Sequence, residues 1–127
     1  MYRLLSVLLL SGFLLACSPS SNEDVIQVSP IESAGLQSNE FAVIIDVRSQ
    51  SEWNEQHIPG AIHIPLRNLE ARFGDLEKFE GKQLIMQCAV GGRSSKAVVL
   101  LQQAGFSDVV NMDGGIVAWK KANLPVE

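Results

Sequence analysis

The chain has 127 residues, which is enough for one domain with a modest core and too few for two. Ten Lys and Arg residues against 14 Asp and Glu residues give a net charge of −4 at pH 7. This charge, with no basic stripe, argues against a nucleic-acid partner. Part of the 46% hydrophobic content lies in the first sixteen residues, so the rest has the composition of an ordinary globular domain.

Residues 1–16 form a predicted signal peptide. Arg3 supplies a positive end, and residues 4–15 form an apolar stretch shorter than the roughly 20 residues of a membrane-spanning helix. The stretch ends in Leu14-Leu15-Ala16-Cys17, which resembles the lipobox of bacterial lipoproteins. The resemblance implies cleavage before Cys17 and lipidation of its thiol. A plain secretory signal that is cut nearby is the alternative.

Residues 17–23 are then a lipidated tether ahead of a domain over residues 24–127. Ser18 after Cys17 implies, by the same resemblance, the periplasmic face of the outer membrane in a Gram-negative cell envelope. If Cys17 is acylated, Cys88 is the one thiol of the mature chain, in an oxidising compartment. It can then form neither an intramolecular disulfide nor a zinc site, so we expect a reactive thiol.

Strand-like and helix-like segments alternate along the rest of the chain. Strands are predicted at residues 25–28, 41–47, 61–64, 84–88 and 109–112. Helices are predicted after Ser29 and Ser49, over residues 66–79 with a division at Gly74, from Ser94 or Ser95 to Ala104, and over residues 116–122. The alternation predicts an α/β domain with a mainly parallel central sheet and helices on both faces.

Polar and reactive residues follow two of the predicted strands. Asp46 and Arg48 come at the end of one strand, and the loop of residues 88–93 follows another. Ligands of parallel sheets bind outside the carboxyl ends of the strands. We therefore expect both groups at one site, near the glycine turn at residues 114–115.

Cys88 stands between a strand and the start of a helix, where unpaired N–H groups and the helix dipole favour an anion. A free thiol is only roughly 3% ionised at pH 7, and the dipole lowers its pKa by about one unit. Loop amides and the charge of Arg93 would have to supply the rest. Gly91 and Gly92 permit the backbone angles that aim amides inward. An inert buried thiol is the alternative.

Four motifs together resemble the rhodanese domain, specifically its single-domain thiosulfate sulfurtransferases, over about residues 25–126. They are Ile45-Asp46-Val47-Arg48 with Glu52 and Trp53, then His57 to Leu66, then Cys88-x-x-Gly91-x-Arg93-Ser94, and Asn111 to Gly115 followed by Trp119 and Pro125. One departure is Gln56, where the family usually has glycine. It affects the geometry of a turn and leaves the chemistry untouched.

The resemblance implies an enzyme that takes a sulfane sulfur from a small anionic donor such as thiosulfate. The sulfur then passes to cyanide or another thiophilic acceptor. Cys88 is the implied nucleophile and carries the sulfur as a persulfide. The implied substrate-binding residues are Ala89, Val90, Gly91, Gly92, Arg93 and Ser94. No metal or organic cofactor is implied, and we expect a monomer.

The charged residues near the loop admit more than one role. Asp46 and Arg48 could bind substrate, but we expect an ion pair between Arg48 and Glu52 that ties the loop to the next helix. Arg93 could bind the anionic donor or brace the loop, and anion binding is slightly favoured.

The histidines and tryptophans of these motifs are expected to be structural. His57 belongs to a turn in the resembled family, and persulfide transfer needs little proton shuttling, so neither His57 nor His63 is expected to be a catalytic base. Trp53 and Trp119 are expected to pack.

Two other functions stay open. The same fold carries cell-cycle phosphatases and arsenate reductases, but the phosphatase loops are one residue longer than the four residues between Cys88 and Arg93 here. An arsenate reductase would also commonly need further thiols. A non-catalytic rhodanese-like binding module typically loses the cysteine, which this chain keeps. The physiological donor and acceptor are not identified by the sequence.

Overall fold

The computed structural model describes residues 25–127. Its strands are β1 (Gln27–Val28), β2 (Ala42–Asp46), β3 (Ile62–His63), β4 (Gln83–Gln87) and β5 (Val109–Met112). Its α-helices are α1 (Pro30–Ser38), α2 (Gln50–Glu55), α3 (Phe73–Leu76), α4 (Gly92–Gln103) and α5 (Gly115–Lys121). The 3-10 turns are η1 (Leu66–Asn68), η2 (Glu70–Arg72) and η3 (Glu77–Phe79). None of these helices is long and apolar enough to cross a membrane.

The predictions about the signal peptide, the tether and the lipidation of Cys17 concern residues outside the described part of the chain.

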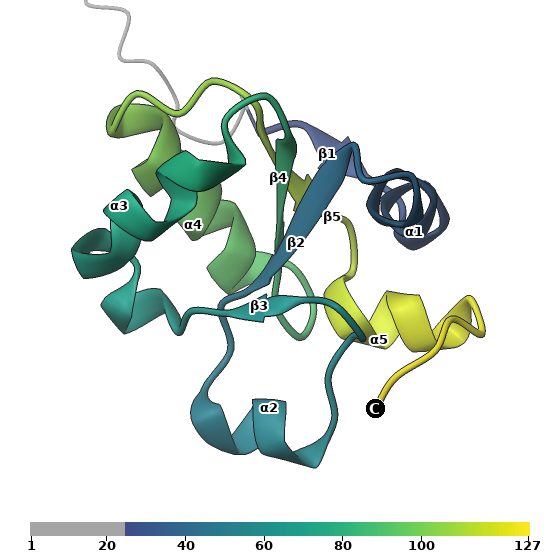
Figure 1. Ribbon diagram of the computed structural model, residues 1–127. Coiled ribbons are helices and arrows are strands. Elements are labelled where there is room, and N and C mark those ends of the chain that lie inside the picture. The colour runs from purple at the N-terminus through teal and green to yellow at the C-terminus, as the bar shows by residue number, and fades with distance from the viewer. Residues whose placement is uncertain (1–24) are drawn as a thin grey trace, which may run out of the picture.

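The strands of the described residues form one parallel sheet in the order β1-β5-β4-β2-β3. β2 and β4 align along their whole length, with Asp46 beside Gln87 at their carboxyl ends. Met86 of β4 lies beside Asn111 of β5. The predicted parallel sheet is confirmed. The carboxyl ends of β2 and β4 lie at the edge of the sheet that faces α2 (Figure 1).

Helices cover both faces of the sheet, as predicted (Figure 1). On one face, Ile45 and Met86 enter a cluster with residues of α4 and of the segment 66–79. On the other face, Ile44 and Ile85 enter a second cluster with residues of α1 and α5. Successive residues of each central strand therefore face different helices, as expected for strands that are buried on both sides.

Serine caps begin two of the helices where the sequence predicts them. The Ser29 hydroxyl accepts a hydrogen bond from the Glu32 N–H at 3.1 Å. Ser49 and Glu52 form a complete capping box, because the Glu52 carboxylate also accepts from the Ser49 N–H at 3.2 Å. This box fixes the Glu52 side chain at the start of α2, beside the carboxyl end of β2.

The segment 66–79 is not the predicted helix divided at Gly74. It consists of η1, η2, α3 and η3, and Gly74 lies inside α3. The apolar residues explain the difference, because Leu66 and Leu69 are three residues apart, as are Leu76 and Phe79. A separation of three keeps side chains on one face of a 3-10 helix.

Helix α4 begins at Gly92, two or three residues before the predicted start at Ser94 or Ser95. Gly91 is its N-cap and has a φ of 114°, a left-handed conformation that glycine adopts at little cost. The turn from β4 into α4 is therefore short, and Arg93 belongs to the first turn of the helix. At the other end, Gly105 follows α4 with a φ of 96°, as predicted for a helix stop.

Candidate active site

Cys88 follows β4 directly and lies beneath the loop that leads into α4. Its side chain is buried, with 1% of the residue exposed. The sulfur accepts a hydrogen bond from the Gly91 N–H at 3.1 Å, and the Ser94 Oγ lies 3.2 Å from it. The Ser94 hydroxyl carries one hydrogen and lies 3.2 Å from the Gly91 carbonyl as well. A thiolate is the stronger acceptor of the two, so ionisation draws this hydrogen to the sulfur.

The surroundings of the thiol act on its pKa in opposite directions. Burial raises the pKa of Cys88, and the Ser94 hydroxyl lowers it, together with the backbone N–H groups of Ser94, Gly91 and Val90. Together the hydrogen bonds outweigh the effect of burial, so the pKa of Cys88 lies below its usual value. The expected ionisable thiol is thus built mainly from a hydroxyl and loop amides.

The six residues of the predicted substrate-binding stretch are not equivalent. Gly91 and Ser94 are buried against the sulfur, while Ala89 and Arg93 are half-buried. Val90 is 68% exposed and presents an apolar side chain at the outer surface of the loop. Gly92 is exposed, and a Cβ there would meet no other atom within 4 Å. The loop thus has an inner, polar side toward the sulfur and an outer side toward solvent.

The start of α5 holds the backbone of the loop from behind. The Cys88 carbonyl accepts hydrogen bonds from the Ile116 N–H at 2.9 Å and from the Gln87 side-chain amide at 2.7 Å. The Ala89 carbonyl accepts from the Val117 N–H at 3.1 Å. These contacts use both carbonyls, so the loop amides remain turned toward the sulfur.

Gly115 permits this close approach. It has a φ of 57°, and a Cβ at this position would overlap the backbone of Cys88 and Ala89. The sequence predicts the glycine turn near the site but not the hydrogen bonds made by Gln87, Ile116 and Val117. The available signal for Gln87 was a polar residue directly after the apolar run Leu84-Ile85-Met86 and before Cys88.

Arg93 is held by Glu52 rather than left free. The guanidinium and the carboxylate form a bidentate ion pair at 2.6 and 2.9 Å. The Arg93 hydrogen bonds are the main reason that the pKa of Glu52 is lowered to about 2; burial opposes the shift and Ser49 adds to it. The pair joins the first turn of α4 to α2, so in this geometry Arg93 braces the loop.

The predicted ion pair between Arg48 and Glu52 is wrong. Arg48 instead pairs with Asp46 at 2.7 Å, and both residues are buried. The prediction used helical spacing, but Arg48 precedes the N-cap Ser49 and lies outside the helix, in the bend between β2 and α2. The Asp46 carboxylate also accepts a hydrogen bond from the Arg48 N–H at 2.9 Å, and this local turn brings the Arg48 side chain back onto Asp46. Its guanidinium also bonds the Gln56 carbonyl at 2.9 Å.

Three aromatic rings stack next to Arg48 and α2. Trp53 stacks on His57 with centroids 3.7 Å apart and on His63 at 4.8 Å. His57 lies 2.9 Å from the Trp53 carbonyl and 3.3 Å from Glu127, and His63 lies 2.8 Å from the Arg48 carbonyl. Among the described contacts none joins either imidazole to the thiol.

Trp119 is buried in the core on the α5 face, where its indole N–H donates to the Pro125 carbonyl at 2.8 Å. The expected packing role of this residue agrees with its position.

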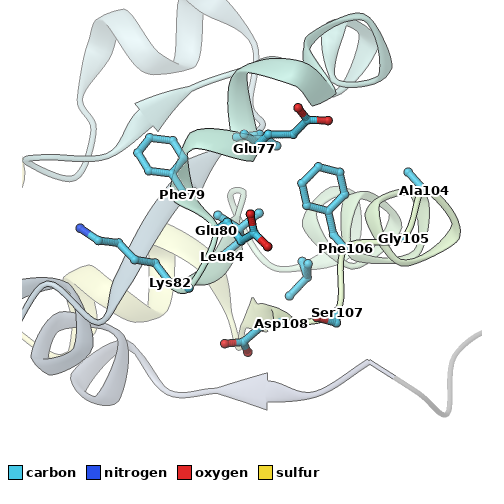
Figure 2. Close-up of a pocket in the computed structure, with 13 residues that line it drawn as sticks. Glu77, Phe79, Glu80, Lys82, Leu84, Ala104, Gly105, Phe106, Ser107 and Asp108 are labelled. Carbon is cyan, nitrogen blue, oxygen red and sulfur yellow. The ribbon is translucent and has the colours of Figure 1, made fainter.

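Two hollows lie at opposite ends of the sheet. The hollow beside the thiol loop has a volume of about 190 Å³ and is lined by Val47, Arg48, Ser49, Pro65, Leu66, Arg67 and Arg93. A larger cavity of about 400 Å³ lies where β4 and β5 begin. Figure 2 shows Phe79 and Phe106 around this cavity, with the carboxylates of Glu77, Glu80 and Asp108. The described residues contain no group of three or more His, Cys, Asp or Glu that could hold a metal ion.

Residues 30–122 match the family model of the rhodanese-like domain. The chain is 31% identical over 94 residues to a sulfurtransferase of Allochromatium vinosum, covering 74% of this chain and 86% of the relative. It is 33% identical over 93 residues to the thiosulfate sulfurtransferase GlpE of Pseudomonas syringae, covering 72% and 84%. An uncharacterized protein of Synechocystis is 31% identical over 106 residues, which are 84% of this chain and 58% of that protein.

Solved structures have the same fold. A protein of unknown function from Rhodopseudomonas palustris, described as a possible tyrosine phosphatase, matches with a TM-score of 0.76 and 26% identity. The match covers 84% of this chain and 88% of that one. The family model spans strands β2 to β5, the thiol loop and the glycine turn behind it. The chain therefore belongs to the family of rhodanese-like domains.

Proposed function

We propose that the protein is a thiosulfate sulfurtransferase that carries sulfur as a persulfide on Cys88. The observation that carries the proposal is the hydrogen bonding of the Cys88 sulfur by Gly91 and Ser94 within a short loop. Relatives named sulfurtransferases support the same reaction class.

The chemistry needs no further oxidant or reductant. The Cys88 thiolate attacks the outer sulfur of thiosulfate, so a new S–S bond forms at Cys88 while the S–S bond of thiosulfate breaks. Sulfite leaves with the electron pair of that bond. Cyanide or a thiolate acceptor then attacks the outer sulfur of the persulfide, and the Cys88 thiolate returns as the leaving group.

The loop serves both steps for one physical reason. Negative charge rests on the Cys88 sulfur before the first step and on the outer sulfur of the persulfide after it. Preorganised donors stabilise such charge in a partly desolvated pocket without reorganising during the reaction. Ser94 and the amides at the start of α4 are donors of this kind.

A phosphatase is the second candidate, because a protein of similar fold is described as a possible tyrosine phosphatase. The loop length argues against it: four residues, 89–92, separate Cys88 from Arg93. In addition, the Arg93 guanidinium is committed to Glu52 and is not available to clamp a phosphoryl group. A binding module without catalysis is the third candidate.

The test is turnover of thiosulfate and cyanide to sulfite and thiocyanate, with 3-mercaptopyruvate and an aryl phosphate as competing substrates. We expect thiosulfate to be the best of these substrates, and Cys88→Ser to remove all sulfur transfer. Gly92→Ala serves as the matched control, because that position is open to a Cβ. Aryl phosphate hydrolysis at a comparable rate would favour the phosphatase, and no turnover of any substrate would favour the binding module.

We also propose that the mature chain is a monomer anchored to the envelope by a lipid at Cys17. The motif Leu14-Leu15-Ala16-Cys17 ahead of a polar stretch supports this anchor. Cys17→Ala should leave unprocessed precursor or another non-acylated form in membrane fractionation and mass spectrometry. A wild-type protein that is unlipidated and cut elsewhere would refute the anchor.

A further inference from the structure

The proposed donor is an anion, yet the arginine of the thiol loop is already paired. Glu52 binds the Arg93 guanidinium through both carboxylate oxygens. Arg48, which is buried, is likewise paired with both carboxylate oxygens of Asp46. Glu52 and Asp46 cancel most of the positive charge of the arginines that they bind. Attraction of a dianionic donor therefore requires a further cation.

Arg67 is a cation without such a partner. It belongs to η1, its side chain is exposed, and no hydrogen bond or ion pair joins it to another described residue. It lines the same 190 Å³ hollow as Arg93 and the backbone after β2. An unpaired guanidinium presents its full charge and its fork of N–H donors to a ligand.

The hollow adjoins the thiol through β2. Val47 lines the hollow, donates its N–H to the Gln87 carbonyl at 2.9 Å, and packs in the same core cluster as Cys88. The Leu66 N–H donates to the Val47 carbonyl at 3.0 Å, which fixes the start of η1 against the end of β2. The backbone that carries Arg67 is thus attached to the strand beside Cys88.

Resting on the proposed function, we propose that Arg67 binds the anionic, oxygen-bearing end of the sulfur donor. The donor lies in the hollow with its sulfonate-like end at Arg67 and its outer sulfur toward Cys88. Arg93 keeps its bracing role through Glu52. Arg67 therefore determines specificity for anionic over neutral donors, and it takes no part in the bond changes.

The test compares two reagents of similar size that differ in charge, iodoacetate and iodoacetamide, in their alkylation of Cys88. Arg67→Gln should slow iodoacetate about five- to tenfold and leave iodoacetamide within a factor of two. The same variant should lower kcat/KM for thiosulfate by a similar factor, mainly through KM. Arg67→Lys should recover part of both losses, and added salt should shrink the wild-type preference for the anion.

Lys82→Gln is the matched control, since it removes one positive charge at the larger cavity, at the other end of the sheet. Equal losses in Arg67→Gln and Lys82→Gln would reduce the effect to net charge and overturn the proposal. The proposal would also be overturned if Arg67→Gln slowed iodoacetate and iodoacetamide equally, or slowed neither. A wild-type Cys88 that reacts with neither reagent would overturn it as well. If the wild type transfers no sulfur, the proposed function fails while the alkylation pair still decides the role of Arg67.

Discussion

The two ends of the sheet offer a ligand very different surroundings. The larger cavity lies where β4 and β5 begin, and its rim carries the carboxylates of Glu77, Glu80 and Asp108. Helix α4 ends beside it, so the negative end of the helix dipole points there as well. The smaller hollow lies where the strands end, beside the thiol and beside the positive start of α4.

The comparison teaches that strand direction, rather than cavity size, decides which end of the sheet offers hydrogen-bond donors to an anion. In a parallel sheet every helix that follows a strand begins at the same edge, and its first N–H groups are unpaired. At the carboxyl edge those of α4 face the Cys88 sulfur, while those of α5 hold the loop carbonyls. The amino edge has room, but there the single cation Lys82 faces three carboxylates, Glu77, Glu80 and Asp108, and the negative end of α4.

The largest expected effect breaks the support behind the loop. Gly115→Ala places a Cβ against the backbone of Cys88 and Ala89, so the loop must move. A displacement of this kind should lower thiosulfate turnover about 100-fold. Gly92→Ala has no such contact and should keep turnover within a factor of two. The measurement is the steady-state turnover of both variants, with thermal unfolding to confirm that each is folded. Similar rates for Gly115→Ala and Gly92→Ala would show that α5 does not support the site.

A smaller effect is expected when one donor to the sulfur is removed. Ser94→Ala deletes the hydroxyl that lowers the pKa of Cys88, so the pKa rises and less thiolate is present at neutral pH. The alkylation rate with iodoacetamide at pH 7 should fall about three- to tenfold, and its pH profile should move to higher pH.

Ser95→Ala is the control for this variant, because no described hydrogen bond involves the neighbouring hydroxyl. An unchanged pH profile in Ser94→Ala would mean that the backbone amides alone set the ionisation of the thiol.

The smallest expected effect concerns the brace between α2 and α4. The pKa of Glu52 is about 2 in the folded chain against an ordinary 4.5, so its pairing stabilises the fold above pH 4.5. This stabilisation is lost as the pH falls from 4.5 toward 2. The side chains of Glu52 and Arg93 are 33% and 41% exposed, and solvent screening reduces the effect to about 1 kcal/mol.

Urea unfolding should therefore find Glu52→Gln about 1 kcal/mol less stable than wild type at pH 7 and nearly equal to it near pH 2. Glu55→Gln, on the same helix and without a described ion pair, should match wild type at both pH values. A deficit for Glu52→Gln that persists unchanged at pH 2 would assign its cause to packing instead of charge.

Local patterns were sufficient for most of the fold. The alternation of apolar strands with helices predicts the parallel sheet. The helix starts are marked within a few residues, as by Ser49 and Glu52 at the beginning of α2. The loop at Cys88 was also predictable, because strand, glycines and helix follow one another directly in the chain. These features depend on neighbours in sequence.

Partners that are far apart in sequence were not predictable in this way. Arg93 and Glu52 are 41 residues apart, and only the folded sheet brings α2 and α4 together. Helical spacing assigned Glu52 to Arg48 instead, but Arg48 lies before the N-cap Ser49 and outside the helix, where it pairs with Asp46. The hollow at Arg67 is also assembled from three separate segments, after β2, around η1 and in α4. No sequence pattern marks such a meeting point.

The most direct test of the account is the intact mass of the protein after incubation with thiosulfate. We expect wild-type protein to gain the mass of one sulfur atom, to lose it on addition of cyanide, and to form thiocyanate in equal amount. Cys88→Ser should gain nothing. The absence of an adduct from thiosulfate or any other sulfane donor, or an adduct that persists in Cys88→Ser, would contradict the claim that Cys88 carries the transferred sulfur.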